Sequence, residues 1–318
     1  MRIKATRESI QLASSIIQKG GLVAFPTETV YGLGADALNP RAAAKIFEVK
    51  RRPTFDPLIV HIAEIEWLEK ITRNIDKRAF KLIEKFWPGP LTLVLFKSPI
   101  VPDIVTAELD TVAIRMPSHP AALELIKLSQ TPIAAPSANL FGHLSPTTAE
   151  HVEKQLGEKT DLILDAGKCP VGVESTVLSL VGEKPVLLRH GGLPLEEIEK
   201  VIGKVARKSK RKKIQSPGQL ARHYSPKTPL KIIKSSDQIP HNENIGILLF
   251  QKPAVKINAQ AVEILSENGD LREAAANLFS ALYRLDESGV KIIYAEPVPE
   301  FGLGQAIMDR LRRAGRTR

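Results

Sequence analysis

The chain has 318 residues, of which 43% are hydrophobic and 25% are charged. This composition is typical of a globular protein, and the length suits two domains. The single cysteine, Cys169, excludes an internal disulfide and any multi-cysteine zinc site. Residues 1–15 lack the apolar core of a secretory signal, and no apolar run approaches the roughly 18 residues of a membrane span. We therefore expect a cytoplasmic protein that does not contact a membrane.

The net charge of +10 is unevenly distributed along the chain. Residues 1–200 contain equal numbers of basic and acidic side chains, whereas residues 201–213 contain seven basic side chains and no acidic one. A short run of this kind is usually a solvated connector, although sequence-tolerant binding of tRNA phosphates is an alternative.

The first part of the chain alternates apolar runs with helical patterns irregularly, which favours a twisted mixed sheet with helices around it. Gly20 is a suitable stop for the first helix, and Asn39-Pro40 suits a cap and first turn for the second. Strands are predicted at 21–25, 57–62, 91–96, 111–116, 132–135, 162–167 and 175–180, and helices near 8–18, 40–49, 76–86, 120–129, 147–156 and 194–202.

A basic segment rich in Pro and Gly separates this part from a second, smaller α/β pattern. We therefore divide the chain into residues 1–203, a linker or lid at 204–229, and a small Rossmann-like domain at 230–318. The last of these has no G-x-G-x-x-G loop that would indicate a dinucleotide. Its predicted strands are 230–233, 245–250, 261–265 and 291–296, and its helices lie near 270–286 and 303–313.

Two stretches near the N-terminus combine polar side chains with turn-forming residues. FPTETVYGLGADA (25–37) follows a strand, and its Gly32 and Gly34 would let the backbone bend and approach a ligand. KRRPTFDPLIVHI (50–62) places cations beside a helix end, where they complement the helix dipole or form an anion clamp. Taken alone, the first stretch favours a tight surface turn with its own side-chain hydrogen bonds, and the second is also compatible with a structural role.

Three later stretches have the same ambiguity. Arg115 of TVAIRMPSHP (111–120) lies in an apolar strand and needs an anionic partner, either a protein carboxylate or a ligand. APSANLFGHLSPT (135–147) contains small hydrogen-bonding side chains without the G-x-S-x-G setting of a nucleophilic serine. VGVESTVLSL and VLLRHGG (within 171–192) place further polar groups near strand ends.

In this order, the stretches resemble the YrdC-like family of threonylcarbamoyl-adenylate synthases. The similarity covers PTETVYGLG, K-x-R-P with PL-x-VHI, T-V-x-x-R, APSAN with SPT, G-V-ESTV and LLRHGG. HYSP (223–226) and FGLGQAIMDRLRRA (301–314) resemble the long form of the family, which has a tyrosine-bearing linker and a Rossmann-like C-terminal domain.

The resemblance implies a nucleotidyltransferase that condenses L-threonine, bicarbonate and ATP into threonylcarbamoyl-AMP and pyrophosphate. A separate tRNA-threonylcarbamoyl transferase complex would then use this product to form N6-threonylcarbamoyladenosine. The resemblance assigns threonine binding to Thr27, His61, Arg115, Ala135 and Ser175. It assigns ATP binding to Lys50, Arg52, Thr54, Thr111, Ser137, Asn139, Ser145, Arg189 and Tyr224.

The residue types suit this chemistry, because all the substrates or their reactive groups are anionic and must converge. Cations such as Lys50 and Arg52 would stabilise charge, with Mg²⁺ held by the ATP phosphates rather than by protein side chains. No covalent nucleophile is predicted. The alternatives are an RNA-binding module, and a carbamoyl-transfer enzyme that would carry acylphosphatase and zinc-finger-like segments.

Overall fold

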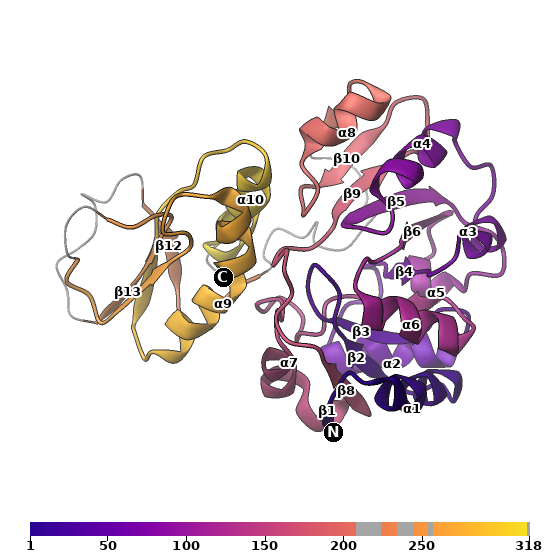
Figure 1. The fold of residues 1–318 in the computed structure, drawn as a ribbon, viewed down its shortest axis with the longest axis horizontal. Helices are drawn as coiled ribbons and strands as arrows, with labels where there is room; N and C mark the ends of the chain where they lie inside the picture. Colours follow the sequence, from indigo (N-terminus) through magenta and orange to yellow (C-terminus); the bar gives the residue numbers. More distant parts are fainter. Residues whose placement is uncertain (208–223, 234–243, 254–256, 317–318) are drawn as a thin grey trace.

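A computed structural model describes residues 1–207, 224–233, 244–253 and 257–316. Within these residues the chain forms two separate sheets, each with its own helices (Figure 1). The predicted strands and helices in both parts are observed, with small shifts at their ends. Most of the predicted linker, including the basic residues at 208–213, lies outside the described residues.

The larger sheet is mixed and runs, in the described residues, in the order β1-β8-β2-β3-β7-β4-β6-β5-β9-β10-β11. Its strands are β1 Arg2–Lys4, β2 Val23–Phe25, β3 Gly32–Asp36, β4 Ile59–His61, β5 Leu91–Phe96, β6 Thr111–Arg115, β7 Ile133–Ala134, β8 Leu162–Asp165, β9 Thr176–Ser179, β10 Val186–Arg189 and β11 Ala206–Arg207. The last of these extends the sheet into residues that we assigned to the linker.

Helices surround this sheet (Figure 1). They are α1 Arg7–Gln18, α2 Pro40–Lys50, α3 Ile65–Ile71, α4 Lys77–Phe86, α5 Asp103–Thr106, α6 Pro120–Ser129, α7 Ala149–Leu156, the 3-10 helix η1 Gly157–Lys159, and α8 Leu195–Ile202. As predicted, Gly20 follows the end of α1 with a φ of 76°, and the Asn39 side chain caps α2 ahead of Pro40.

The alternation of side chains along the strands explains how helices cover both faces of the sheet. Val23 and Phe25 of β2 pack in one cluster with α1 and α6, whereas Ala24, between them, packs in another with α2. The β2 strand is therefore buried on both sides, as expected for a continuous apolar run.

The stretch that we interpreted as a glycine-rich turn contains a strand. Gly32 and Gly34 belong to β3, which pairs antiparallel with β2. A Cβ atom at Gly34 would lie 2.7 Å from the Phe25 ring and 2.8 Å from Ile133, so glycine is required there for packing rather than for bending. The sequence pattern also fails to predict β1, β10, β11, α3 and α5, which are short or rich in charged residues.

The smaller sheet is parallel and runs, in the described residues, in the order β12-β15-β13-β14, which supports the predicted Rossmann-like arrangement. Its strands are β12 Leu230–Ile232, β13 Ile245–Leu249, β14 Ala261–Ile264 and β15 Ile292–Ala295, and its helices are α9 Leu271–Glu287 and α10 Leu303–Ala314.

The two parts share a hydrophobic core. Figure 1 shows α9 and α10 on the side of the smaller sheet that faces the larger part of the molecule. Val30, Leu144 and Val173 of the larger part belong to the same buried cluster as residues of α9 and α10. The Tyr283 ring stacks on His151 with centroids 3.8 Å apart, and its hydroxyl donates to the Leu144 carbonyl at 2.9 Å. The helices of the smaller part are thus packed against loops of the larger part.

Every helix in the described ranges is too short or too polar to cross a membrane.

Candidate active site

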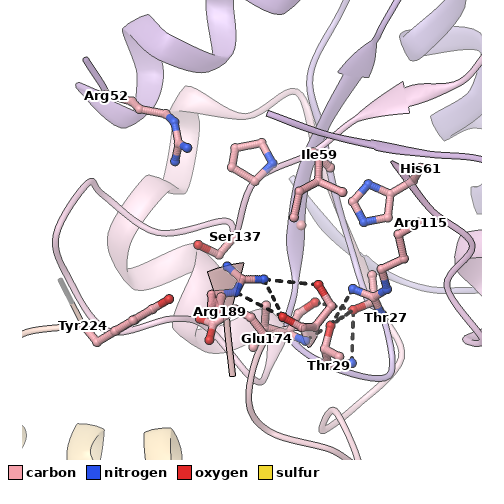
Figure 2. A pocket seen from close by; sticks show the side chains of 15 residues that line it. Thr27, Thr29, Arg52, Ile59, His61, Arg115, Ser137, Glu174, Arg189 and Tyr224 are labelled. Carbon is pink, nitrogen blue, oxygen red and sulfur yellow. Dashed lines mark hydrogen bonds between the residues drawn. The ribbon is translucent and has the colours of Figure 1, made fainter. Parts of the chain in front are cut away.

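One pocket of the larger part collects polar and charged side chains from many distant segments (Figure 2). It lies at the ends of the central strands and is bounded on one side by Tyr224. Its lining residues are Thr27, Thr29, Val30, Gly32, Arg52, Ile59, His61, Arg115, Ala135, Pro136, Ser137, Glu174, Ser175, Arg189 and Tyr224.

All five residues predicted to bind threonine line this pocket. His61 and Arg115 end the neighbouring parallel strands β4 and β6 and lie side by side in register. Ala135 directly follows β7, and Ser175 directly precedes β9. The sheet brings these side chains together because β4 pairs with β6 on one side and antiparallel with β7 on the other, where the Ala135 amide donates to the Ile59 carbonyl at 2.8 Å.

The predicted ATP-binding residues divide into two groups. Arg52, Ser137, Arg189 and Tyr224 line the pocket. Thr54 is exposed outside it, and Thr111 lies at the opposite end of β6 from Arg115. The others that do not line the pocket are Lys50, Asn139 and Ser145, which are buried behind the wall.

Lys50 holds part of the wall from behind. Its ammonium group donates to the carbonyl oxygens of Ser137 and Asn139, and the Ser137 hydroxyl in turn donates to the Asn139 side chain. Burial and the nearby Arg52 charge lower the pKa of Lys50 well below its ordinary value. In this structure Lys50 thus fixes the backbone of the 137–139 loop.

Arg115 has the protein carboxylate partner that its apolar strand requires. Its Nη2 lies 2.6 Å from Glu28 Oε1, its Nη1 donates to the Thr29 hydroxyl at 2.9 Å, and its Nε donates to the Gly89 carbonyl at 3.2 Å. The ion pair lacks hydrogen-bond geometry, so Nη2 retains the capacity to donate to a ligand.

Arg52 and Arg189 are also oriented by protein contacts. Arg52 pairs with Asp56 at 2.9 Å and donates to the carbonyls of Asp56 and Pro57. Arg189 donates to the Ser175 carbonyl at 2.8 Å and to its hydroxyl at 3.1 Å. Burial lowers the pKa of both arginines. Because a guanidinium keeps its proton in proteins, both side chains act as cations here.

His61 is neutral near pH 7. Burial, aided by the charge of Arg115, lowers its pKa to about 3. Its Nδ1 is buried and has no hydrogen-bond partner among the residues that the structure describes. A neutral imidazole at this place can exchange a hydrogen bond with a polar substrate without adding charge.

Sequence reasoning missed several residues of the site. Thr29 and Glu174 line the pocket, while Glu28 and Asp56 supply the counter-charges of Arg115 and Arg52. The available signal was that a buried arginine requires an acid, but the sequence does not identify which acid. Among the described residues, no group of three or more His, Cys, Asp or Glu side chains is arranged to hold a metal ion.

The fold and pocket define an α/β protein built to gather anionic groups over a mixed sheet. Residues 15–191 match the family model described as telomere recombination, that of the Sua5, YciO and YrdC proteins. Residues 193–315 match the one described as threonylcarbamoyl-AMP synthase, C-terminal domain.

Individual proteins of this kind are similar to the chain over nearly its whole length. The chain is 47% identical to the threonylcarbamoyl-AMP synthase of Pyrococcus abyssi, and the match covers 96% of this chain and 93% of that protein. It is 46% identical to the one of Bacillus subtilis, covering 96% and 92%. The crystal structure of P. abyssi Sua5 complexed with L-threonine matches with a TM-score of 0.91 at 44% identity, over 99% of this chain and 96% of that one.

The chain therefore belongs to the threonylcarbamoyl-AMP synthase family, in the two-domain form. The predicted fold class, family, activity and enzyme class are confirmed.

Proposed function

We propose that threonylcarbamoyl-AMP is formed in this pocket and that the lining residues have the roles predicted from the sequence. The observation that carries the proposal is that three buried arginines, Arg52, Arg115 and Arg189, reach one pocket from separate elements. The substrates bring a carboxylate, a carbamate and a triphosphate, which repel one another in the absence of such cations.

The threonine half of the reaction is assigned to the end of the pocket at His61 and Arg115. The amine of L-threonine attacks bicarbonate, and loss of water leaves a carbamate. Arg115 would bind the threonine carboxylate through the N–H groups of Nη2, which make no hydrogen bond within the described residues. Thr27 and His61 would hydrogen-bond the other polar groups of the threonine. A site that hydrogen-bonds the threonine hydroxyl would reject valine, because its own polar group would be left unpaired.

The nucleotide half is assigned to Arg52, Ser137, Arg189 and Tyr224. The carbamate oxygen attacks the α-phosphorus of ATP, the bond to the β-phosphate oxygen breaks, and pyrophosphate leaves. Arg52 and Arg189 would stabilise the charge that spreads over the phosphates. Direct contacts of Lys50, Thr54, Thr111, Asn139 and Ser145 with ATP stay predictions.

Alignment and charge stabilisation fit this pocket better than a covalent intermediate. Ser175 lines the pocket, and its hydroxyl lies 2.7 Å from the Thr92 hydroxyl and accepts from Arg189. Neither contact would remove its proton, so the serine is not set up as a nucleophile.

Mg²⁺ bound to the ATP phosphates would neutralise charge on the departing pyrophosphate. The carboxylates around the pocket suit an ion carried by the nucleotide, since Glu28, Asp56 and Glu174 are each paired with an arginine. The role of these residues toward the metal is thus to leave its coordination sphere to phosphate and water.

The wider assignment follows from the product. Threonylcarbamoyl-AMP must pass to a tRNA-threonylcarbamoyl transferase complex, and we place the enzyme in the cytoplasm with its acceptor tRNA. The division of the chain at residues 203 and 229 stays a prediction, and so does the role of residues 204–213 as a solvated connector, with tRNA binding as its alternative.

The test is an omission assay on the purified full chain. Pyrophosphate release from ATP is expected only when L-threonine and bicarbonate are both present, and valine should replace threonine poorly. Release without threonine, or formation of ADP, would exclude this function.

A further inference from the structure

An arginine of the C-terminal helix α10 reaches the wall of the pocket. Arg310 is completely buried, although its helix belongs to the smaller part of the molecule. Its Nε and Nη2 donate to Glu174 Oε2 at 3.0 and 2.9 Å, and its Nη1 donates to the His190 carbonyl at 2.5 Å. A fully buried arginine is costly to desolvate, so its contacts have to be strong and specific.

These contacts join three segments that form one side of the pocket. Glu174 lines the pocket next to Ser175, and His190 follows Arg189 directly in the chain. The Arg310 guanidinium also lies over the Tyr224 ring, 5.1 Å from its centroid. Figure 2 shows Glu174, Arg189 and Tyr224 together on the same side of the pocket. One side chain from α10 therefore contacts all three segments.

Tyr224 needs such support because its backbone is in the left-handed region, with a φ of 64°. That conformation is unfavourable for a residue other than glycine, asparagine or aspartate. Two further contacts hold the segment: the Ser225 amide donates to the Gly142 carbonyl at 2.9 Å, and the Tyr224 ring packs against Phe279 of α9.

The charge of Glu174 must also be compensated where an anionic nucleotide binds. Its Oε1 accepts from the Ser145 hydroxyl, and its Oε2 is occupied by Arg310. Burial alone would raise the pKa of Glu174, but the charges of Arg310 and Arg189 outweigh it and lower the pKa, so the carboxylate stays ionised. Without Arg310, Arg189 would be the remaining arginine that offsets this buried negative charge in the pocket wall.

We propose that Arg310 is a positioning residue for nucleotide binding, through which the C-terminal domain fixes Glu174, the 189–190 segment and Tyr224. The assignment of this side of the pocket to ATP rests on the proposed function. Arg310 does not line the pocket, so its effect must pass through these three contacts.

The test is direct binding of ATP and of L-threonine to the full chain, measured by calorimetry without turnover. Arg310→Gln should weaken ATP binding at least about tenfold while changing L-threonine binding much less. Arg312→Gln is the matched control, because Arg312 lies on the same helix but forms an exposed pair with Glu300. It should bind both ligands like the wild type.

The proposal is overturned if folded Arg310→Gln binds ATP like the wild type, or if it loses both ligands equally. If Arg310→Gln does not fold, the double variant Arg310→Met/Glu174→Gln removes both charges and is expected to fold. It should still lose ATP affinity, because Tyr224 and the 189–190 segment lose their anchor. Wild-type ATP affinity in that variant would mean that Arg310 only compensates the charge of Glu174 and does not position the nucleotide site. A wild-type protein that binds ATP but makes no threonine adduct would refute the proposed function alone.

Discussion

Arg115 and Glu28 form a buried ion pair, with Nη2 and Oε1 2.6 Å apart, that connects strand β6 to the loop after β2. The pair makes Arg115 both a structural and a candidate binding residue. Removing one partner of such a pair leaves a buried uncompensated charge, so a loss of activity in a single variant would have two explanations.

Arg115→Met should therefore lose stability by about 3 kcal/mol in urea unfolding, and it should lose L-threonine binding. The double variant Arg115→Met/Glu28→Gln removes both charges and is expected to regain most of the stability. It should not regain threonine binding, because the cation for the carboxylate is absent. Recovery of threonine affinity in the double variant would limit Arg115 to a structural role.

A variant of Lys50 tests whether this residue affects ATP binding by supporting the 137–139 loop. Lys50→Met leaves the carbonyls of Ser137 and Asn139 without their donor, at a cost of about 1–3 kcal/mol. We expect weaker ATP binding with it, because the 137–139 loop forms part of the pocket. Lys45→Met is the control: Lys45 is on the same helix and donates to the Gly20 carbonyl at 2.6 Å, away from the pocket. Unchanged ATP affinity in Lys50→Met would contradict this reading.

His61 should make stability depend on pH. Its folded pKa of about 3 lies below its ordinary value of 6.5, so the unfolded chain binds the proton more readily. The contribution of His61 is complete above pH 6.5 and is lost as the pH falls toward 3, by up to about 1.4 kcal/mol per pH unit.

Urea unfolding of the wild type and of His61→Asn at pH 7, 6 and 5 checks this expectation. The variant should lose less stability on acidification, and the difference between the two curves isolates His61 from the other histidines. Parallel curves would mean that His61 titrates normally in the folded protein.

Two glycines test how closely α9 must pack on the site. Gly172 and Gly167 have similar positive φ values, 74° and 81°, so alanine strains the backbone equally at both, by about 1–2 kcal/mol. A Cβ atom at Gly172 would lie 2.4 Å from the Ala275 carbonyl oxygen of α9, whereas a Cβ atom at Gly167 would have no atom of the described residues within 4 Å, its chain neighbours apart.

Gly172→Ala should consequently be less stable than Gly167→Ala and less active, because it displaces the loop that leads to Glu174 and Ser175. Thermal unfolding and pyrophosphate release of both variants give the comparison. Equal behaviour would show that α9 can move away from this loop without consequence.

The sequence predicted strands and helices best where apolar periodicity was sustained, as in β5 and α9. It failed at β3, because Gly32 and Gly34 have low strand propensity and Gly34 is required there by its close packing against Phe25 and Ile133. Such a tertiary requirement is invisible in a local pattern.

The candidate site was predictable where residues occur in recognisable strings at strand ends, as His61 and Ser175 do. Its electrostatic partners were not. Arg52 pairs within its own segment, but Arg115 and Arg310 pair with Glu28 and Glu174 across long stretches of chain. Which acid faces which arginine depends on how the segments pack.

The most direct measurement is the mass of the product formed by the purified chain from ATP, L-threonine and isotopically labelled bicarbonate. The proposed reaction gives an AMP adduct that contains threonine and the labelled carbon, formed together with pyrophosphate. An adduct of AMP and threonine without the label, or labelled carbon that never appears joined to AMP, would contradict it.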